Sequence, residues 1–360
     1  MPAGADGHAR LRALRWLCLA IAPAADTAAL DTVWPREDQW QQVVALADAG
    51  FVLPALGRAI DRHALRGRLP DDLVQFLDAI FALNAERRAA LRRQMIALNQ
   101  RLAGAGIEPV WMKGAETLIT ADWAARDRVM RDLDLWIVDT EARRAALDLL
   151  DGDGWLTFAA DEGKRGWDLS HHDRPLHHPD WPAPIEIHRS PVIRQQASVL
   201  PSRATADAVL WSRWEGGPFG QLDPVSGALL SLVQATAMAH ADFALGRVPL
   251  MKSLDFAERI ERDFGGMLPA ALRTRLALPS IRRLSPRMLT FVAEFYGLPL
   301  PVQSDRSYVR AVERDLLQPR LNAAIGVSKD FLGRRALGLL QEPGRLPGLL
   351  RDLLRPPSKA

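Results

Sequence analysis

The sequence is short of cysteine, of lysine and of long apolar runs, and each shortage excludes a class of protein. The single cysteine, Cys18, rules out an intramolecular disulfide and a cysteine-based zinc site, so the chain is no disulfide-stabilised secreted scaffold. We therefore expect a reducing, cytoplasmic environment and a core position for Cys18. Only 5 of the 46 basic residues are lysines, which makes a lysine in a conspicuous position more informative than an arginine.

No stretch of 18 apolar residues occurs, so we expect no membrane-spanning helix. The apolar run that follows Leu11 has the composition of a secretory leader, but Leu11, Leu14, Leu17 and Ile21 recur at helical spacing and favour an ordinary helix. With 48% hydrophobic and 25% charged residues, the composition is typical of a globular protein with a sizeable core.

The net charge of +3 is unevenly distributed along the chain. Residues 271–360 hold 16 Lys or Arg against 7 Asp or Glu, and the last 30 residues mix leucines with basic residues in a pattern typical of amphipathic helices. The alternatives for this tail are packing on the rest of the protein, contact with a membrane surface and binding to a partner. We do not expect nucleic acid to be a partner.

Hydrophobic periodicity divides the chain into four parts. They are an N-terminal helical lobe at 1–106, a core with short strands at 107–198, a C-terminal helical domain at 199–330 and a basic amphipathic tail at 331–360. The expected fold class is α+β, with a small mixed sheet and its helices between helical flanks. The expected helices of the flanks include Leu83–Leu102, Val225–His240 and Leu250–Arg262.

Short apolar runs, glycine turns and helical patterns alternate within the core. The expected elements are a strand at Ile107–Met112, a turn at Lys113–Ala115 that leads into a helix to about Ala125, a strand at Leu133–Val138, a helix at 140–151 capped by Thr140, an extended segment at Trp155–Ala159 and a strand at Pro184–His188. Strands are therefore expected only between about 107 and 190.

Asp132 and Asp134 are the strongest chemical signal in the sequence. Because side chains alternate along a strand, both carboxylates lie on one face. Like charges side by side on a buried strand repel each other, and a bound cation removes the repulsion. Carboxylate oxygens are the ligands that Mg²⁺ prefers, with Mn²⁺ as an alternative. The competing interpretation is a solvent-facing pair bonded to Arg126, Arg128 and Arg131.

A third acid, Glu186, lies between two isoleucines in the last short strand of the core. If this strand lies beside that of Asp132 and Asp134, Glu186 projects onto the same face, within about 4.8 Å of an aspartate. The three carboxylates would then share one divalent ion. The competing interpretation is an edge-strand glutamate paired with His188 or Arg189.

The turn formed by Lys113, Gly114 and Ala115 follows the first strand and opens a helix. Glycine allows close approach of the backbone, and unpaired amides at the start of a helix point toward an anion. Lys113 adds a compact positive charge suited to triphosphate oxygens. The competing interpretation is a generic glycine turn with an exposed lysine.

Together these three elements resemble the nucleotidyltransferase superfamily, in which a glycine turn precedes an acid-x-acid strand and a third acid on a neighbouring strand. The resemblance is closest to a bacterial family of uncharacterised nucleotidyltransferases: Met112–Ala115 corresponds to its Lys-Gly-Ala turn, Arg128–Asp134 to its Arg-x3-Asp-x-Asp strand and Glu186–His188 to its Glu-x-His strand. It covers about residues 35–300. The wider superfamily usually has serine where this chain has Ala115.

The resemblance implies a Mg²⁺-dependent enzyme that transfers a nucleoside monophosphate from a nucleoside triphosphate to a hydroxyl or phosphate of an acceptor and releases pyrophosphate. The implied catalytic and metal-binding residues are Asp132, Asp134 and Glu186. The implied nucleotide- and phosphate-binding residues are Lys113, Gly114, Ala115, Arg128 and Arg131. The acceptor, a small molecule or a peptide, does not follow from these motifs.

Five of the eight histidines fall close together, and they are His171, His172, His177, His178 and His188. The first four have a His-His-x4-His-His spacing that suits zinc, contact with substrate or phosphate, or hydrogen bonding within a loop. The candidate substrate contacts are His178, His188, His240 and Asp255. The last two lie on expected helices after the core, where packing or capping is their alternative role.

Other functions remain open. A degenerate member of the fold would bind a nucleotide or a partner without chemistry. A helical adaptor would bind nucleic acid or a peptide through the basic tail. A transferase of the same fold would use a sugar-type donor. The presence of all three acids favours the enzyme.

Overall fold

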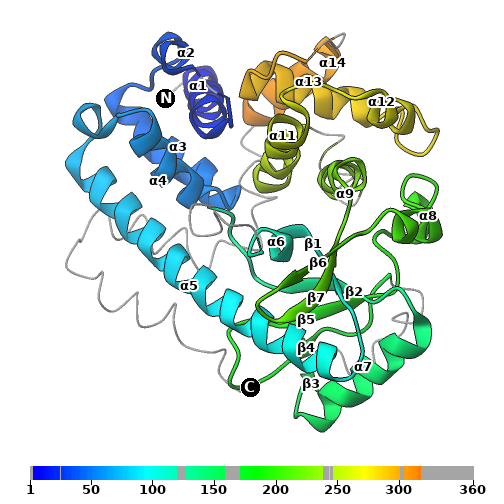
Figure 1. Cartoon of the computed structure of the whole chain (residues 1–360). Coiled ribbons are helices and arrows are strands. Elements are labelled where there is room, and N and C mark those ends of the chain that lie inside the picture. The colour runs from blue at the N-terminus through cyan, green and yellow to red at the C-terminus, as the bar shows by residue number, and fades with distance from the viewer. Residues whose placement is uncertain are drawn as a thin grey trace. The chain divides into compact units, whose positions relative to one another are not determined.

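The computed structural model describes residues 3–24, 26–119, 127–158, 171–237, 243, 246–300 and 304–317. Its α-helices are α1 (Ala3–Ile21), α2 (Thr27–Thr32), α3 (Trp40–Ala49), α4 (Leu53–Arg62), α5 (Asp71–Gly104), α6 (Lys113–Glu116), α7 (Thr140–Gly152), α8 (Ser202–Asp207), α9 (Pro224–Thr236), α11 (Leu250–Phe264), α12 (Ala270–Leu276), α13 (Ser285–Tyr296) and α14 (Arg306–Leu317) (Figure 1). Its strands are β1 (Val110–Met112), β2 (Leu133–Trp136), β3 (Leu156–Thr157), β4 (Leu176–His177), β5 (Ile185–His188), β6 (Leu210–Trp214) and β7 (Gly217–Gln221).

The described residues form two compact units. The sheet unit comprises Ala85–Val233 and Pro269–Arg282 and contains every described strand. The helical unit comprises the described parts of Met1–Asn84, Gln234–Leu268 and Arg283–Ala360. A mixed sheet, with helices toward both ends of the chain, confirms the expected α+β fold class. The division into four parts at 106, 198 and 330 stays a prediction.

Within the described residues, the sheet has seven strands in the order β3-β4-β5-β2-β1-β7-β6. β2 pairs in parallel with β5 and antiparallel with β1, and β1 pairs in parallel with β7. A parallel pair requires a long crossover connection, and the chain between β2 and β5 supplies one that includes α7. The register of β2 and β5 places Asp134 opposite Glu186.

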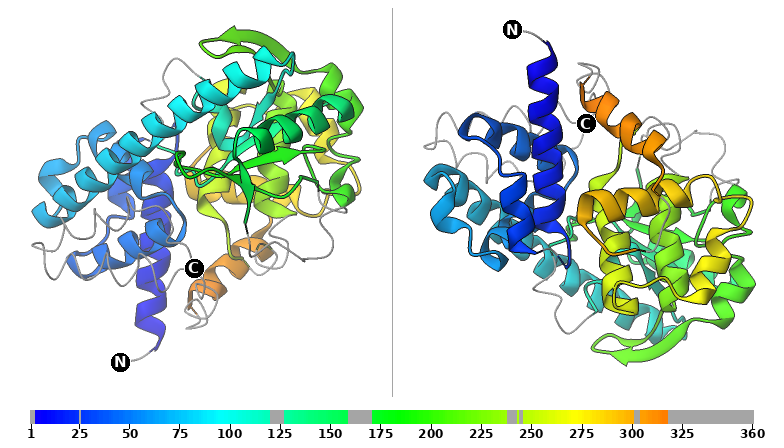
Figure 2. Two further views of the ribbon diagram at one scale, coloured as in Figure 1. Left: turned by 90° about the horizontal axis from the view of Figure 1, so that it is seen from below. Right: turned by 90° about the horizontal axis from the view of Figure 1, so that it is seen from above.

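Alternation along β2 and β5 gives the centre of the sheet an apolar and a polar face. The side chains on the apolar face are buried in one core cluster with residues of α5 and α7. These side chains belong to Leu133, Leu135, Ile185 and Ile187. The left view of Figure 2 shows the C-terminal half of α5, together with α7, in front of the strands. Asp134, Glu186 and His188 therefore project from the opposite face.

The β6–β7 hairpin contradicts the expectation that strands end near residue 190, because β7 pairs with β1 and extends the central sheet. Glycine in a strand usually argues against strand structure. At Gly220, however, a Cβ would lie 2.6 Å from Val209 Cγ1 and 3.0 Å from Val110 Cγ2, so glycine permits the close approach of β7. Leu210 and Trp211 on the edge strand are about half exposed, at 54% and 49%, which leaves no clear alternation to detect.

Two expected helix boundaries are wrong. α5 begins at Asp71 rather than at Leu83, because helical periodicity continues upstream of the segment that shows it most clearly. α6 ends at Glu116 and is followed by a turn, whereas the pattern predicts a helix to about Ala125. Residues 120–126 lie outside the described residues.

The cap of α7 is also one residue earlier than expected. Asp139, rather than Thr140, is the N-cap, and its Oδ1 accepts a hydrogen bond from the Ala142 amide at 2.7 Å. Aspartate is preferred to threonine as an N-cap, which agrees with the position that the structure shows. β1, β2, β3 and β5 lie inside the expected extended segments, and α9 and α11 lie where helices are expected.

The helical unit packs around α1, which contacts α3, α4, α13 and α14. Trp16 is fully buried and meets Trp40 and Trp34 edge-on, with ring centroids 5.0 and 5.7 Å apart. Cys18 is fully buried, as expected, and burial raises the pKa of its thiol, which suppresses the reactive thiolate. Among the described residues, no helix is both long and apolar enough to cross a membrane.

Candidate active site

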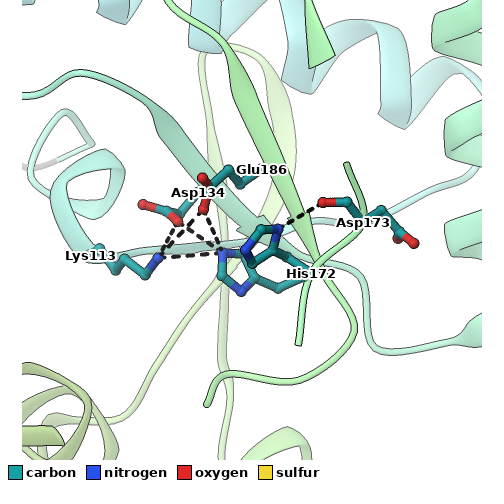
Figure 3. Close-up of polar contacts among 6 residues, drawn as sticks. Lys113, Asp134, His172, Asp173 and Glu186 are labelled. Atoms are coloured by element: carbon teal, nitrogen blue, oxygen red, sulfur yellow. Dashed lines mark hydrogen bonds and ion pairs between the residues drawn. The ribbon is translucent and has the colours of Figure 1, made fainter. Parts of the chain in front are cut away.

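Asp134, Glu186 and Lys113 meet on the polar face of the sheet (Figure 3). Asp134 and Glu186 are direct neighbours because β2 and β5 pair in register. Lys113 follows β1 directly, and Met112, the last residue of β1, lies opposite Asp134. Three elements that are far apart in the sequence therefore each supply a charged group.

The contacts of these residues form one network. The Lys113 ammonium donates a hydrogen bond to Asp134 Oδ1, and its Nζ lies 3.9 Å from Glu186 Oε2. His188 Nε2 lies 2.8 Å from the same Asp134 oxygen and 3.7 Å from Glu186 Oε2. Lys113 Nζ and His188 Nε2 are 3.5 Å apart. Both carboxylates thus lie within about 4 Å of the Lys113 ammonium and of His188 Nε2.

Because this network is largely buried, its charges must be paired with one another rather than with water. The side-chain exposed fraction is 4% for Asp134, 21% for Glu186 and 14% for Lys113. Burial alone raises the pKa of Asp134, but the Lys113 charge and the His188 hydrogen bond outweigh it, and the net effect is a lowered pKa. Burial and then the Asp134 charge raise the pKa of Glu186 to about 7.

His188 is held neutral in this network. Burial, followed by the Lys113 charge, lowers the pKa of His188 to about 4, and the hydrogen bond to Asp134 opposes that shift. A neutral imidazole that donates Nε2–H to a carboxylate fixes the orientation of that carboxylate without adding charge. His188 therefore orients Asp134, while Lys113 supplies the positive charge.

The donor atoms fit a divalent cation. One ligand atom each from Asp134, Glu186 and His188 lies within 4.8 Å of the others. Two carboxylates suit the oxygen preference of Mg²⁺, and an imidazole suits Mn²⁺ when its Nε2 does not donate to Asp134. Within the described residues, no other group of three His, Cys, Asp or Glu side chains has this spacing.

Asp132 lies directly before β2 and is not part of that group of donor atoms. Its charge still acts on the site, because it contributes to the raised pKa of Glu186. Burial and the Asp134 charge raise the pKa of Asp132 itself, against the lowering effect of Lys113 and Arg128. The structure thus brings Glu186 and Asp134 together, while the metal-binding role of Asp132 stays a prediction.

The glycine turn has an unusual backbone and tight packing. Lys113 has φ of 54°, a left-handed conformation that is strained for a residue other than glycine and often marks a functional position. A Cβ on Gly114 would overlap the Arg128 guanidinium and lie 2.8 Å from Met130 Cγ. Glycine is therefore needed to admit Arg128 to the turn, a packing role that the sequence pattern does not reveal. Ala115 is fully buried.

Two arginines of α5 hold the backbone between the turn and β2. Arg88 is 1% exposed, and its Nη1 donates to Thr117 Oγ1 and to the Arg128 carbonyl, both at 3.4 Å. Thr117 in turn donates its hydroxyl to the carbonyl of the turn glycine at 2.7 Å. Arg87 Nε donates to the Met130 carbonyl at 3.0 Å. The helix therefore positions both segments that carry proposed phosphate ligands.

Arg87 and Arg88 were not predicted, because the helix has many arginines and its pattern does not single out these two. A signal exists for one of them: Arg88 precedes Leu91 by three residues and Met95 by seven, which places it on the apolar side of the helix. A charged residue on that side must find buried acceptors.

Two histidines of the 171–178 segment join the site. His172 forms an antiparallel bridge with His188, and the rings of His171 and His172 lie 5.1 and 5.4 Å from the His188 ring. His172 Nδ1 lies 2.7 Å from the Asp173 carbonyl oxygen (Figure 3). The Asp173 carboxylate is itself fixed by ion pairs with two arginines.

The other two histidines of that segment lie elsewhere. His177 stacks on Phe158 with ring centroids 4.5 Å apart, and His178 lies 5.5 Å from Trp155. The four histidines therefore do not supply a shared zinc site in the described part of the chain. The role of His178 as a substrate contact stays a prediction.

Three further candidates have no tested role. Arg131 is exposed just before β2. Asp255 lies on α11 in the helical unit. His240 lies outside the described residues.

A mixed sheet with two adjacent carboxylates beside a Lys-Gly turn is the arrangement that the resemblance to nucleotidyltransferases predicts. Residues 36–297 match the family of uncharacterised nucleotidyltransferases. Because this match spans more than half of the chain, the protein belongs to that family, as the resemblance over about residues 35–300 predicts. No curated protein and no solved structure matches the chain.

Proposed function

We propose that this protein is a Mg²⁺-dependent nucleotidyltransferase that transfers a nucleoside monophosphate from a nucleoside triphosphate to a hydroxyl or phosphate of an acceptor and releases pyrophosphate. The observation that carries the proposal is the register of β2 and β5, which sets Asp134 and Glu186 side by side on a buried face next to Lys113. Membership of the family supports a triphosphate as the donor.

Asp134 and Glu186, with Asp132 beside them, would hold the divalent ion, Mg²⁺ or Mn²⁺. An ion bound there supplies charge neutralisation for the triphosphate and for in-line displacement at its α-phosphorus. Glu186 would complete the cation site or accept the proton of the acceptor hydroxyl. His188 would keep Asp134 in its orientation through the Nε2 hydrogen bond.

The proposed phosphate-binding set is Lys113, Gly114, Ala115, Arg128 and Arg131. Because the Arg128 guanidinium packs against Gly114, one turn brings two positively charged side chains within reach of the same anion. α6 has only four residues, so these side-chain charges contribute more than the dipole of the helix.

Turnover of labelled triphosphates tests the proposal. We expect the full-length protein to release pyrophosphate from at least one α-labelled nucleoside triphosphate with Mg²⁺, and Asp134→Asn to reduce the rate by about 100-fold or more while the circular dichroism of the folded protein is kept. Asp148→Asn makes the same change on the exposed side of α7 and should turn over normally. Mg²⁺-dependent turnover that survives Asp134→Asn refutes the proposal.

A second candidate is a protein that binds a nucleotide without chemistry. The observation in its favour is the Lys113 ion pair, which balances the charge of Asp134, the carboxylate whose pKa is lowered. Mg²⁺-dependent consumption of triphosphate, above that of a blank, separates the two candidates.

A further inference from the structure

Lys113 occupies the part of the site where a metal ion is expected. Its ammonium contacts Asp134 and Glu186 (Figure 3). It also lies 3.5 Å from His188 Nε2. These are the three residues whose donor atoms are spaced for a divalent ion. The side chain is also largely buried, so the ammonium is no solvated surface charge that happens to lie nearby.

A divalent ion and the Lys113 ammonium cannot occupy this position together. Mg²⁺ binds carboxylate oxygens at about 2.1 Å. An ion shared by Asp134 Oδ1 and Glu186 Oε2 would lie next to the ammonium, which donates to the first oxygen and lies 3.9 Å from the second. Like charges at such short range repel strongly where little water screens them. Metal binding therefore requires the ammonium to leave Asp134.

The turn offers the ammonium another partner when an anion is present. The charge of Lys113 sits at the end of a flexible four-carbon chain, so it can move while the backbone stays in place. The Arg128 guanidinium packs against Gly114 in the same turn. An anion bound there would lie beside both cations. The ammonium could then exchange the Asp134 carboxylate for this anion as its negative partner.

We propose that Lys113 is a built-in counter-cation that keeps the metal position closed until a nucleoside triphosphate draws its ammonium away. Divalent metal and triphosphate then bind with positive coupling, and each raises the affinity of the other by the same factor. This inference rests on the proposed function, because it takes the triphosphate as the anion at the turn. Lys113 thereby couples the entry of the metal ion to the binding of the nucleotide.

Binding of Mn²⁺, followed through the electron paramagnetic resonance signal of the free ion, tests this in the full-length protein without turnover. The probes are Mn²⁺ alone and Mn²⁺ with the non-cleavable α,β-methylene analogues of the four nucleoside triphosphates. In the wild type we expect an analogue to tighten Mn²⁺ binding about fivefold or more. Lys113→Met keeps the length of the side chain and removes its charge. It should bind Mn²⁺ alone about fivefold or more tightly than the wild type, and an analogue should add little.

Two further variants make the result decisive. Lys252→Met removes a lysine of α11 in the helical unit and should bind Mn²⁺ as the wild type does. Lys113→Gly removes the side chain and suits the φ of 54°, so a folding defect in Lys113→Met does not decide the outcome. Equal or weaker Mn²⁺ binding by both Lys113 variants overturns the inference, and Mg²⁺-dependent turnover by the wild type would then leave the proposed function standing. Absence of Mn²⁺ binding in every protein, with and without analogue, overturns both.

Discussion

Asp134 and Glu186 lie side by side on a buried sheet face, and their different surroundings decide which of them is ionised. Lys113 and the His188 hydrogen bond lower the pKa of Asp134 against the effect of burial, whereas burial and the Asp134 charge raise the pKa of Glu186 to about 7. Near neutral pH the metal-free site therefore carries one firmly ionised carboxylate and one that titrates. A divalent ion would stabilise both in the ionised form.

His63, a residue of the helical unit, gives a prediction about pH. Its Nε2 lies 3.1 Å from the Ala20 carbonyl and its Nδ1 2.9 Å from Thr27 Oγ1. Burial and then the Arg62 charge lower the pKa of His63 below its ordinary 6.5, and the Ala20 hydrogen bond only partly opposes them. The unfolded chain therefore takes up this proton first, and the stability contributed by neutral His63 is present above pH 6.5 and is lost as pH falls through the folded pKa.

We expect wild type to melt at a higher temperature than His63→Asn at pH 7.5, and the difference to shrink as pH falls below 6.5. Thermal denaturation at several pH values between 7.5 and 5 measures it. A difference that stays constant or grows toward pH 5 contradicts this role of His63.

At the scale of elements, the site depends on a helix, α5, that lies outside the group of donor atoms. Arg88 of α5 ties Thr117, next to the glycine turn, to the Arg128 carbonyl on the segment that leads into β2. One helix thus sets the relative position of the turn and the aspartate strand. Because the Arg88 donor is buried and both acceptors are partly buried, the loss of this donor leaves polar groups that water replaces only in part.

The variant Arg88→Met tests this positioning. We expect a loss of about 1–3 kcal/mol of unfolding free energy and a raised KM for the triphosphate, because Arg128 and the turn shift together. In a double-mutant cycle with Thr117→Val, the two losses should be non-additive by about 0.5 kcal/mol or more. Arg93→Met removes an exposed arginine of the same helix and is the matched control. Strict additivity, with an unchanged KM, would show that Arg88 does not link the two segments.

At the scale of the whole molecule, the sequence predicts those features of the fold and the site that depend on residues close together in the chain. Alternation of acidic and apolar side chains predicts β2 and β5, and it is the same alternation that buries Leu135 and Ile187 and so sets Asp134 beside Glu186. A register shift of one residue would bury the acids among the apolar residues. The pairing of these acids therefore follows from local pattern together with one assumption, that the two strands are neighbours.

Features that depend on distant parts of the chain were not predictable in this way. The place of β7 beside β1 depends on the close approach that Gly220 allows. The hydrogen bonds of the buried Arg88 depend on Thr117 and the Arg128 carbonyl, which are distant from it in the sequence. The sequence pattern places Asp132 on the same strand face as Asp134. The group whose donor atoms are spaced for a metal ion nevertheless contains His188 and not Asp132. Each of these is a tertiary property.

The most direct test of the central claim is an anomalous difference map at the manganese edge, from crystals grown with Mn²⁺ and a non-cleavable triphosphate analogue. We expect a peak between the carboxylates of Asp134 and Glu186, at coordination distance from both, about 2.1 Å for an ion of the size of Mg²⁺, with the Lys113 ammonium turned toward the phosphates. Two results would contradict the claim. One is bound analogue without a peak between these two carboxylates, and the other is a peak found only elsewhere in the protein.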